Sequence, residues 1–182
     1  MPFDTTSMIA FQEREEEARK ASMIPVGTYN WDIEKSEVTE VGGVPRLRVQ
    51  HRLEASKDGR QLGRIHSEFF NWYANENSDS TTPIDQRERN LRGMTGRKLH
   101  GYMKALAECP TSTQEIGEQF DECYKGLMSA DDPEEVGDLL RGIGILLEGQ
   151  YLTGRITHSG TWSNLQAEKF DPRIGAAQSV TV

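Results

Sequence analysis

The residue types that most often carry out catalysis are present in this chain but are not grouped. The four histidines are His51, His66, His100 and His158. None stands beside a carboxylate or a second histidine at a spacing that suits a metal or a catalytic pair. The two cysteines lie in helix-like sequence without a nearby histidine, and no phosphate-binding loop, HExxH, GxSxG or CxxC motif occurs. The sequence therefore predicts a protein that is not an enzyme and that binds neither a metal nor a cofactor.

Arginines and aromatic rings, in contrast, occur at a spacing that suits nucleic acid. Alternate side chains of a β-strand point to one face, and three arginines share one face of RLRVQHR (46–52). In RIHSEFFNWY (64–73), the residues at even positions share one face, and Ile65 and Phe69 lie on the other. If Ile65 and Phe69 point into the core, the even positions lie beside the arginines. Cations track phosphates and rings stack on bases, so this outer face predicts a nucleic-acid-binding surface.

The predicted binding residues divide by their chemistry. Phosphate contacts are expected from Arg46, Arg48, Arg52, Arg64 and Arg155. Stacking on bases is expected from Phe70, Trp72 and Trp162, and His66 shares the predicted face. A second interpretation is that Phe70 and Trp72 pack beneath a helical segment, while the arginines form a solvated face that discourages edge pairing. The two interpretations predict opposite solvent exposure for these two rings.

The elements that must position these residues can be predicted from periodicity and turn signals. Alternating polar and apolar residues predict strands within 24–38, 44–54 and 64–73, joined by a Gly-Gly and an Asp-Gly turn. Capping patterns and helical spacing predict helices over about 83–147. Residues 148–170 predict a hairpin with a Ser-Gly turn. The order is three strands, a helical segment and two strands.

This order predicts an α+β fold, in which a five-stranded antiparallel barrel of the OB type carries a helical insert between strands 3 and 4. The barrel domain would span residues 23–173, with the insert at about 83–147. Residues 1–22 predict an N-terminal helix or arm, and residues 174–182 predict a flexible tail.

Charge is segregated along the chain, although the net charge is -8. Residues 44–66 carry +4 and residues 87–104 carry +5, whereas residues 108–148 carry -9. The chain can therefore present one basic and one acidic surface. The mean hydropathy is -0.67, and no apolar run reaches the roughly 18 residues of a membrane span. The first residues lack the basic-then-apolar order of a signal peptide, so we expect a cytoplasmic protein.

Three short motifs resemble a phage protein family that has long been catalogued as a domain of unknown function. They are Pro25/Gly27/Tyr29, Gly63/Arg64 and Gly160/Asn164/Leu165/Pro172, within residues 24–75 and 135–173. The family is considered similar to single-stranded-DNA-binding proteins and to have an OB-type fold. The resemblance implies single-stranded DNA binding in phage DNA replication or recombination, in the cytoplasm of the host cell.

Two functions are therefore expected from the sequence. The first is sequence-independent binding of single-stranded DNA, with phage replication or recombination proteins as further partners of the acidic residues 108–148. The alternative is a non-enzymatic interaction or structural module that holds a protein partner through the same acidic helical segment. Both functions are compatible with a homo-oligomer.

Overall fold

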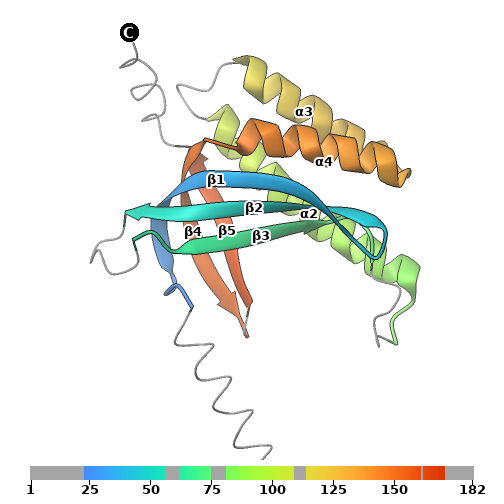
Figure 1. Cartoon of the computed structure of the whole chain (residues 1–182), viewed down its shortest axis with the longest axis horizontal. Coiled ribbons are helices and arrows are strands. Elements are labelled where there is room, and N and C mark those ends of the chain that lie inside the picture. The colour runs from blue at the N-terminus through green and yellow to red at the C-terminus, as the bar shows by residue number, and fades with distance from the viewer. Residues whose placement is uncertain (1–22, 56–61, 75–80, 109–113, 161, 171–182) are drawn as a thin grey trace, which may run out of the picture.

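The computed structural model describes residues 23–55, 62–74, 81–108, 114–160 and 162–170 (Figure 1). The predicted N-terminal helix or arm and the predicted tail lie outside these residues. The described chain is α+β, with a five-stranded antiparallel sheet and three helices, as the order of sequence signals predicts.

The sheet is formed by strands from both ends of the described chain. The strands are β1 (Gly27–Val41), β2 (Val44–Ala55), β3 (Ile65–Asn71), β4 (Tyr151–Ser159) and β5 (Trp162–Phe170). They lie in the order β3-β2-β1-β4-β5, and all neighbours are antiparallel. β1 and β2 are joined by Gly42 and Gly43, whose φ of 63° and 78° is the left-handed conformation that glycine adopts readily. β3 and β5 are the two edges, and the sheet is not closed between them.

Three helices follow β3, where the sequence predicts a helical insert. They are α2 (Ile84–Ala107), α3 (Gln114–Ser129) and α4 (Pro133–Leu147). α4 begins at a cap in which the Asp132 side chain accepts a hydrogen bond from the Glu135 N–H. α2 packs against β3 and β5, α4 packs against β1 and β2, and α3 packs on both helices (Figure 1). The inner face of the sheet is therefore covered by helices.

The core lies between the inner face of the sheet and these helices. β2 contributes the residues that its alternation predicts, namely Leu47, Val49, His51 and Leu53. α2 and α4 contribute Leu99, Tyr102, Leu106, Val136, Leu140, Ile143 and Leu147. Burial of each large apolar side chain stabilises the fold by about 1.5–3 kcal/mol, so this core holds the insert firmly against the sheet.

β3 presents the opposite face from the one predicted. Leu47 of β2 pairs with Phe70 of β3, and directly paired residues point to the same side of a sheet. Phe70 is therefore buried with Leu47, at 0% exposure. Ile65 and Phe69, which were expected in the core, are 46% and 37% exposed. This reversal decides which ring lies beside the arginines of β2.

Candidate nucleic-acid interface

The outer faces of β2 and β3 bring two arginines beside one aromatic ring. In the ladder between these strands, Arg48 is directly opposite Phe69, and Arg46 is opposite Asn71. The Cζ atom of Arg46 lies 4.7 Å from the centre of the Phe69 ring, and that of Arg48 lies 5.9 Å away. Both distances are within the range of cation–π attraction, about 6 Å. The ring is thus held by cations while part of it faces solvent.

An open groove of about 540 Å³ extends from this ring to the first residue of β5. We call it the β3–α2 groove, and it is lined by Arg46, Ser67, Glu68, Phe69, Asn71, Met94, Lys98, Trp162, Ser163 and Asn164. Trp162 is 76% exposed, and Met94 on α2 is 49% exposed. Exposed apolar side chains gathered in a concave site indicate a binding surface more strongly than scattered ones do.

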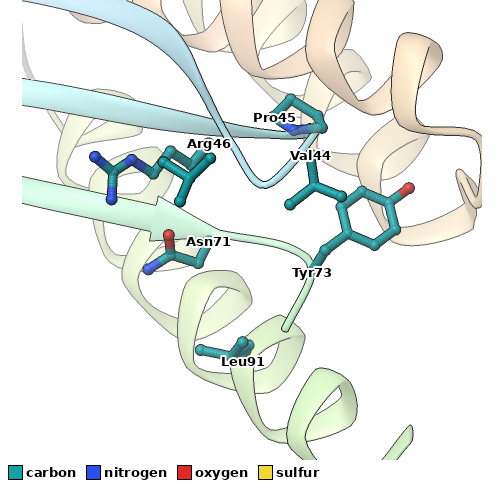
Figure 2. Close-up of a pocket in the computed structure, with 7 residues that line it drawn as sticks. Val44, Pro45, Arg46, Asn71, Tyr73 and Leu91 are labelled. Carbon is teal, nitrogen blue, oxygen red and sulfur yellow. The ribbon is translucent and has the colours of Figure 1, made fainter. Parts of the chain in front are cut away.

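A second hollow of about 260 Å³ adjoins the groove at Arg46 and Asn71. It is lined in addition by Val41, Val44, Pro45, Tyr73 and Leu91. Figure 2 shows the ring of Tyr73 beside Val44, with Leu91 projecting from α2 below Asn71. The hydroxyl of Tyr73 donates a hydrogen bond to the main-chain oxygen of Asp131, 2.8 Å away, which fixes the ring. Concave surface therefore continues from the groove toward the β1–β2 turn.

Arg52, one of the predicted phosphate contacts, is surrounded by carboxylates. Its guanidinium lies 3.0 Å from Asp32, 3.6 Å from Glu34 and 2.9 Å from Glu54. The charge of Glu54 and the hydrogen bond to Asp32 are the main causes that raise the pKa of Arg52. A phosphate would have to compete with three negative charges at this position.

Arg48 and Arg46 are less compensated. Arg48 lies 3.3 Å from the carboxylate of Glu37, whereas Arg46 donates a hydrogen bond of 3.1 Å to the neutral hydroxyl of Thr39. Among the residues that the structure describes, Arg46 makes no ion pair. Arg46 is therefore the strongest candidate in the groove for contact with an anionic ligand.

The structure does not bring the other two predicted arginines to the groove. Arg64 precedes β3, at the end of that strand away from the groove. Arg155 is exposed on β4 and pairs with Thr28 near the start of β1, whereas Arg46 pairs with Thr39 near its end. The arginines that were predicted to form one outer surface are thus separated along the length of β1.

Three of the predicted binding residues lie inside the protein, which corrects their assignment. Phe70 and Trp72 are 0% and 1% exposed, and His66 is 9% exposed. The ring of Phe70 packs edge-on against Tyr102 of α2, with centres 5.9 Å apart, and the Arg92 guanidinium lies 5.5 Å from the Trp72 ring. Of the two interpretations drawn from the sequence, packing beneath the helical insert is the correct one. These side chains cannot stack on bases because no ligand can reach them.

Sequence periodicity misses Phe69, Asn71 and Met94 among the groove residues. A period of two separates Phe69 from Phe70 but does not say which of them faces the core. The signal that could have found Phe69 is the register with β2, because aligning Phe70 with buried Leu47 places Phe69 beside the arginines. Met94 has no comparable signal, since its place in the groove depends on how α2 packs.

Metal-binding groups and membrane-spanning helices are two further features to consider. No group of three or more His, Cys, Asp or Glu residues in the described ranges could hold a metal ion. Within the same ranges, every helix is too short or too polar to cross a membrane. No protein-family model matches the chain, and no curated protein matches its sequence. The function must therefore be inferred from the groove itself.

Proposed function

We propose that the β3–α2 groove binds single-stranded DNA without reading its sequence. One observation carries the proposal: the guanidinium of Arg46 lies over the exposed ring of Phe69, in the same groove as the exposed ring of Trp162. Every base has a face on which an aromatic ring can stack, and cations beside the rings attract the phosphates that link the bases. Stacking needs unpaired, separated bases, so a single strand is the preferred form.

We also propose that the sheet is a partly open barrel of the OB type. Its two edges, β3 and β5, line the same groove, and a side chain of β3 bonds to the backbone of β5. OB-type barrels bind oligonucleotides on the face of strands 2 and 3 and at the loops between strands 1 and 2 and strands 4 and 5. The groove is lined by residues of β2 and β3 and reaches the first residue of β5, and the neighbouring hollow reaches Val41 and Val44 on either side of the β1–β2 turn. A role in phage DNA replication or recombination is proposed from the sequence resemblance.

Tryptophan fluorescence offers a direct test because the three tryptophans differ in exposure. Trp31 and Trp72 are 0% and 1% exposed, whereas Trp162 is 76% exposed. We expect oligo-dT to quench the emission at low salt and the quenching to weaken as salt is added, because phosphate contacts release counterions. In Trp162→Phe the ring remains but the quenchable emission is lost, so a labelled oligonucleotide should still bind while the protein signal stays constant.

The energetic contribution of stacking is measured with alanine variants. Trp162→Ala and Phe69→Ala should each weaken binding by about 1–3 kcal/mol, which is roughly 5-fold to 150-fold in dissociation constant. Ile145→Ala on α4 is the matched control, because Ile145 is also exposed, at 69%, and does not line the groove. A duplex of equal length should bind more weakly than the single strand, and oligo-U compares RNA with DNA.

The proposal fails if oligo-dT causes neither quenching nor a gel shift at low salt. It also fails if Ile145→Ala weakens binding as much as Phe69→Ala does. Either result would leave the alternative prediction, a module that holds a protein partner through the acidic helices, as the one to pursue.

A further inference from the structure

The two edge strands of the sheet are connected by a side chain instead of a backbone ladder. Glu68 lies on β3 and points to the inner side of the sheet, where it is 3% exposed. Its Oε1 atom accepts a hydrogen bond of 2.6 Å from the backbone N–H of Leu165 on β5. An edge strand normally presents such N–H groups to solvent or to another strand. In this protein the carboxylate of Glu68 takes the place of that partner.

The same carboxylate bonds to two further side chains. Oε1 lies 2.9 Å from Nε2 of His66 on β3, and Oε2 forms an ion pair with Nζ of Lys98 on α2. Burial alone raises the pKa of Glu68, but the hydrogen bond to His66, the charge and hydrogen bond of Lys98 and the N–H of Leu165 outweigh it and lower that pKa. Glu68 is therefore ionised at neutral pH. A buried carboxylate is tolerated only with such partners, so the contacts hold β3, β5 and α2 together.

These contacts lie directly beneath the β3–α2 groove. Glu68 is adjacent in sequence to Phe69, and Leu165 follows Trp162 by three residues. Lys98 is one helical turn after Met94 and, with Glu68, lines the groove. The distance between the ring on β3 and the ring on β5 thus depends on how closely these strands are held.

We propose that the Glu68 carboxylate is a clasp that holds β5 against β3 and so sets the spacing of Phe69 and Trp162. Glu68 is a positioning residue, because the proposed effect is transmitted through its hydrogen bond to the backbone of β5. The clasp is a property of the protein alone; its effect on binding rests on the proposed single-stranded DNA function. The experiment therefore measures the two parts separately.

The test compares two double variants that have the same net charge as the wild-type protein. Glu68→Leu with Lys98→Met removes the acceptor for the Leu165 N–H together with the buried ion pair. Glu68→Gln with Lys98→Met also removes the ion pair but keeps a side-chain oxygen that can accept this hydrogen bond. The difference between the two variants isolates the clasp from the charge of the groove.

The first readout is amide hydrogen exchange of the protein without ligand. We expect the Leu165 amide to exchange roughly tenfold faster in the leucine variant than in the glutamine variant, which corresponds to one lost hydrogen bond. The amides of Leu53 and Ile33, which donate to the main-chain oxygens of Arg64 and Gln150, should keep their protection and so report an intact sheet. Equal exchange at Leu165 in the two variants would overturn the clasp.

The second readout is the affinity of both variants for oligo-dT. We expect the leucine variant to bind several-fold to about tenfold more weakly than the glutamine variant, because misplacement of one stacking ring removes part of its contribution to binding. Faster exchange at Leu165 with equal affinities would overturn the positioning role. If the wild-type protein does not bind oligo-dT at all, the proposed function fails, while the exchange data still decide whether the clasp exists.

Discussion

His51 gives this protein a dependence of stability on pH that can be worked out from the structure. The ring is fully buried on β2, and its Nε2 atom lies 2.8 Å from the hydroxyl of Tyr102 on α2. Burial, together with the charge of nearby His66, lowers the pKa of His51 from 6.5 to about 3. The unfolded chain takes up a proton as the pH falls below 6.5, whereas the folded protein stays neutral at this site down to about pH 3. Stability from this group is therefore fully present above pH 6.5 and decreases as the pH falls toward 3.

Between pH 7 and pH 5 this site becomes mostly protonated in the unfolded chain, and the result is equivalent to full protonation over about 1.5 pH units. Because one pH unit then corresponds to 1.36 kcal/mol, this group should reduce the free energy of unfolding by about 2 kcal/mol. His51→Gln keeps a polar partner for Tyr102 and cannot titrate. Between pH 7 and pH 5 its free energy of unfolding should therefore decrease by about 2 kcal/mol less than that of the wild-type protein. Urea unfolding at the two pH values measures the difference, and the other histidines, present in both proteins, largely cancel. Equal losses in the two proteins would refute a neutral, buried His51.

Two further predictions concern the groove arginines and the packing of the sheet. Arg46→Gln should lower the slope of log affinity for oligo-dT against log salt by about 0.7, the value for one phosphate contact on a single strand, whereas Arg52→Gln should leave it unchanged. Equal slopes for both variants would contradict the inference that Arg46 contacts a phosphate and that the carboxylates around Arg52 keep it from doing so. Gly154→Ala should destabilise the protein by about 1–3 kcal/mol, because the added Cβ would lie 2.8 Å from the side chains of two leucines. Gly101→Ala, where nothing lies within 4 Å, is the control, and unfolding by urea compares them.

The order of elements and the arginine face of β2 could be predicted because both depend on local sequence. Alternation is unbroken from residue 46 to residue 53, so one face of β2 is apolar apart from His51. The glycines at 42 and 43 mark the turn before the strand, and Pro133 marks the start of α4. None of these signals depends on contacts with distant parts of the chain.

The face of β3 could not be predicted, because each of its faces carries both apolar and polar residues. His66 and Glu68 have the composition of a solvent-facing pair, and this favoured the wrong assignment. Both are buried because they bond to each other and because Glu68 also bonds to Lys98, which lies 30 positions further along the chain. Which face of β3 is buried therefore depends on a distant partner, Lys98, that strand periodicity does not reveal. Phe69 was assigned to the core for the same reason.

Charge counted along the sequence also overstates the cations that a ligand can reach. Because directly paired residues of antiparallel strands point to the same side of a sheet, outer residues of β1 fall opposite the arginines of β2. The pairs are Asp32–Arg52, Glu37–Arg48 and Thr39–Arg46. Two of these three pairs contain a carboxylate, and the third contains the arginine that lies closest to the Phe69 ring. The availability of a cation in the groove thus follows from the neutral side chain of Thr39, a residue of the neighbouring strand. The charge of β2 alone cannot predict it.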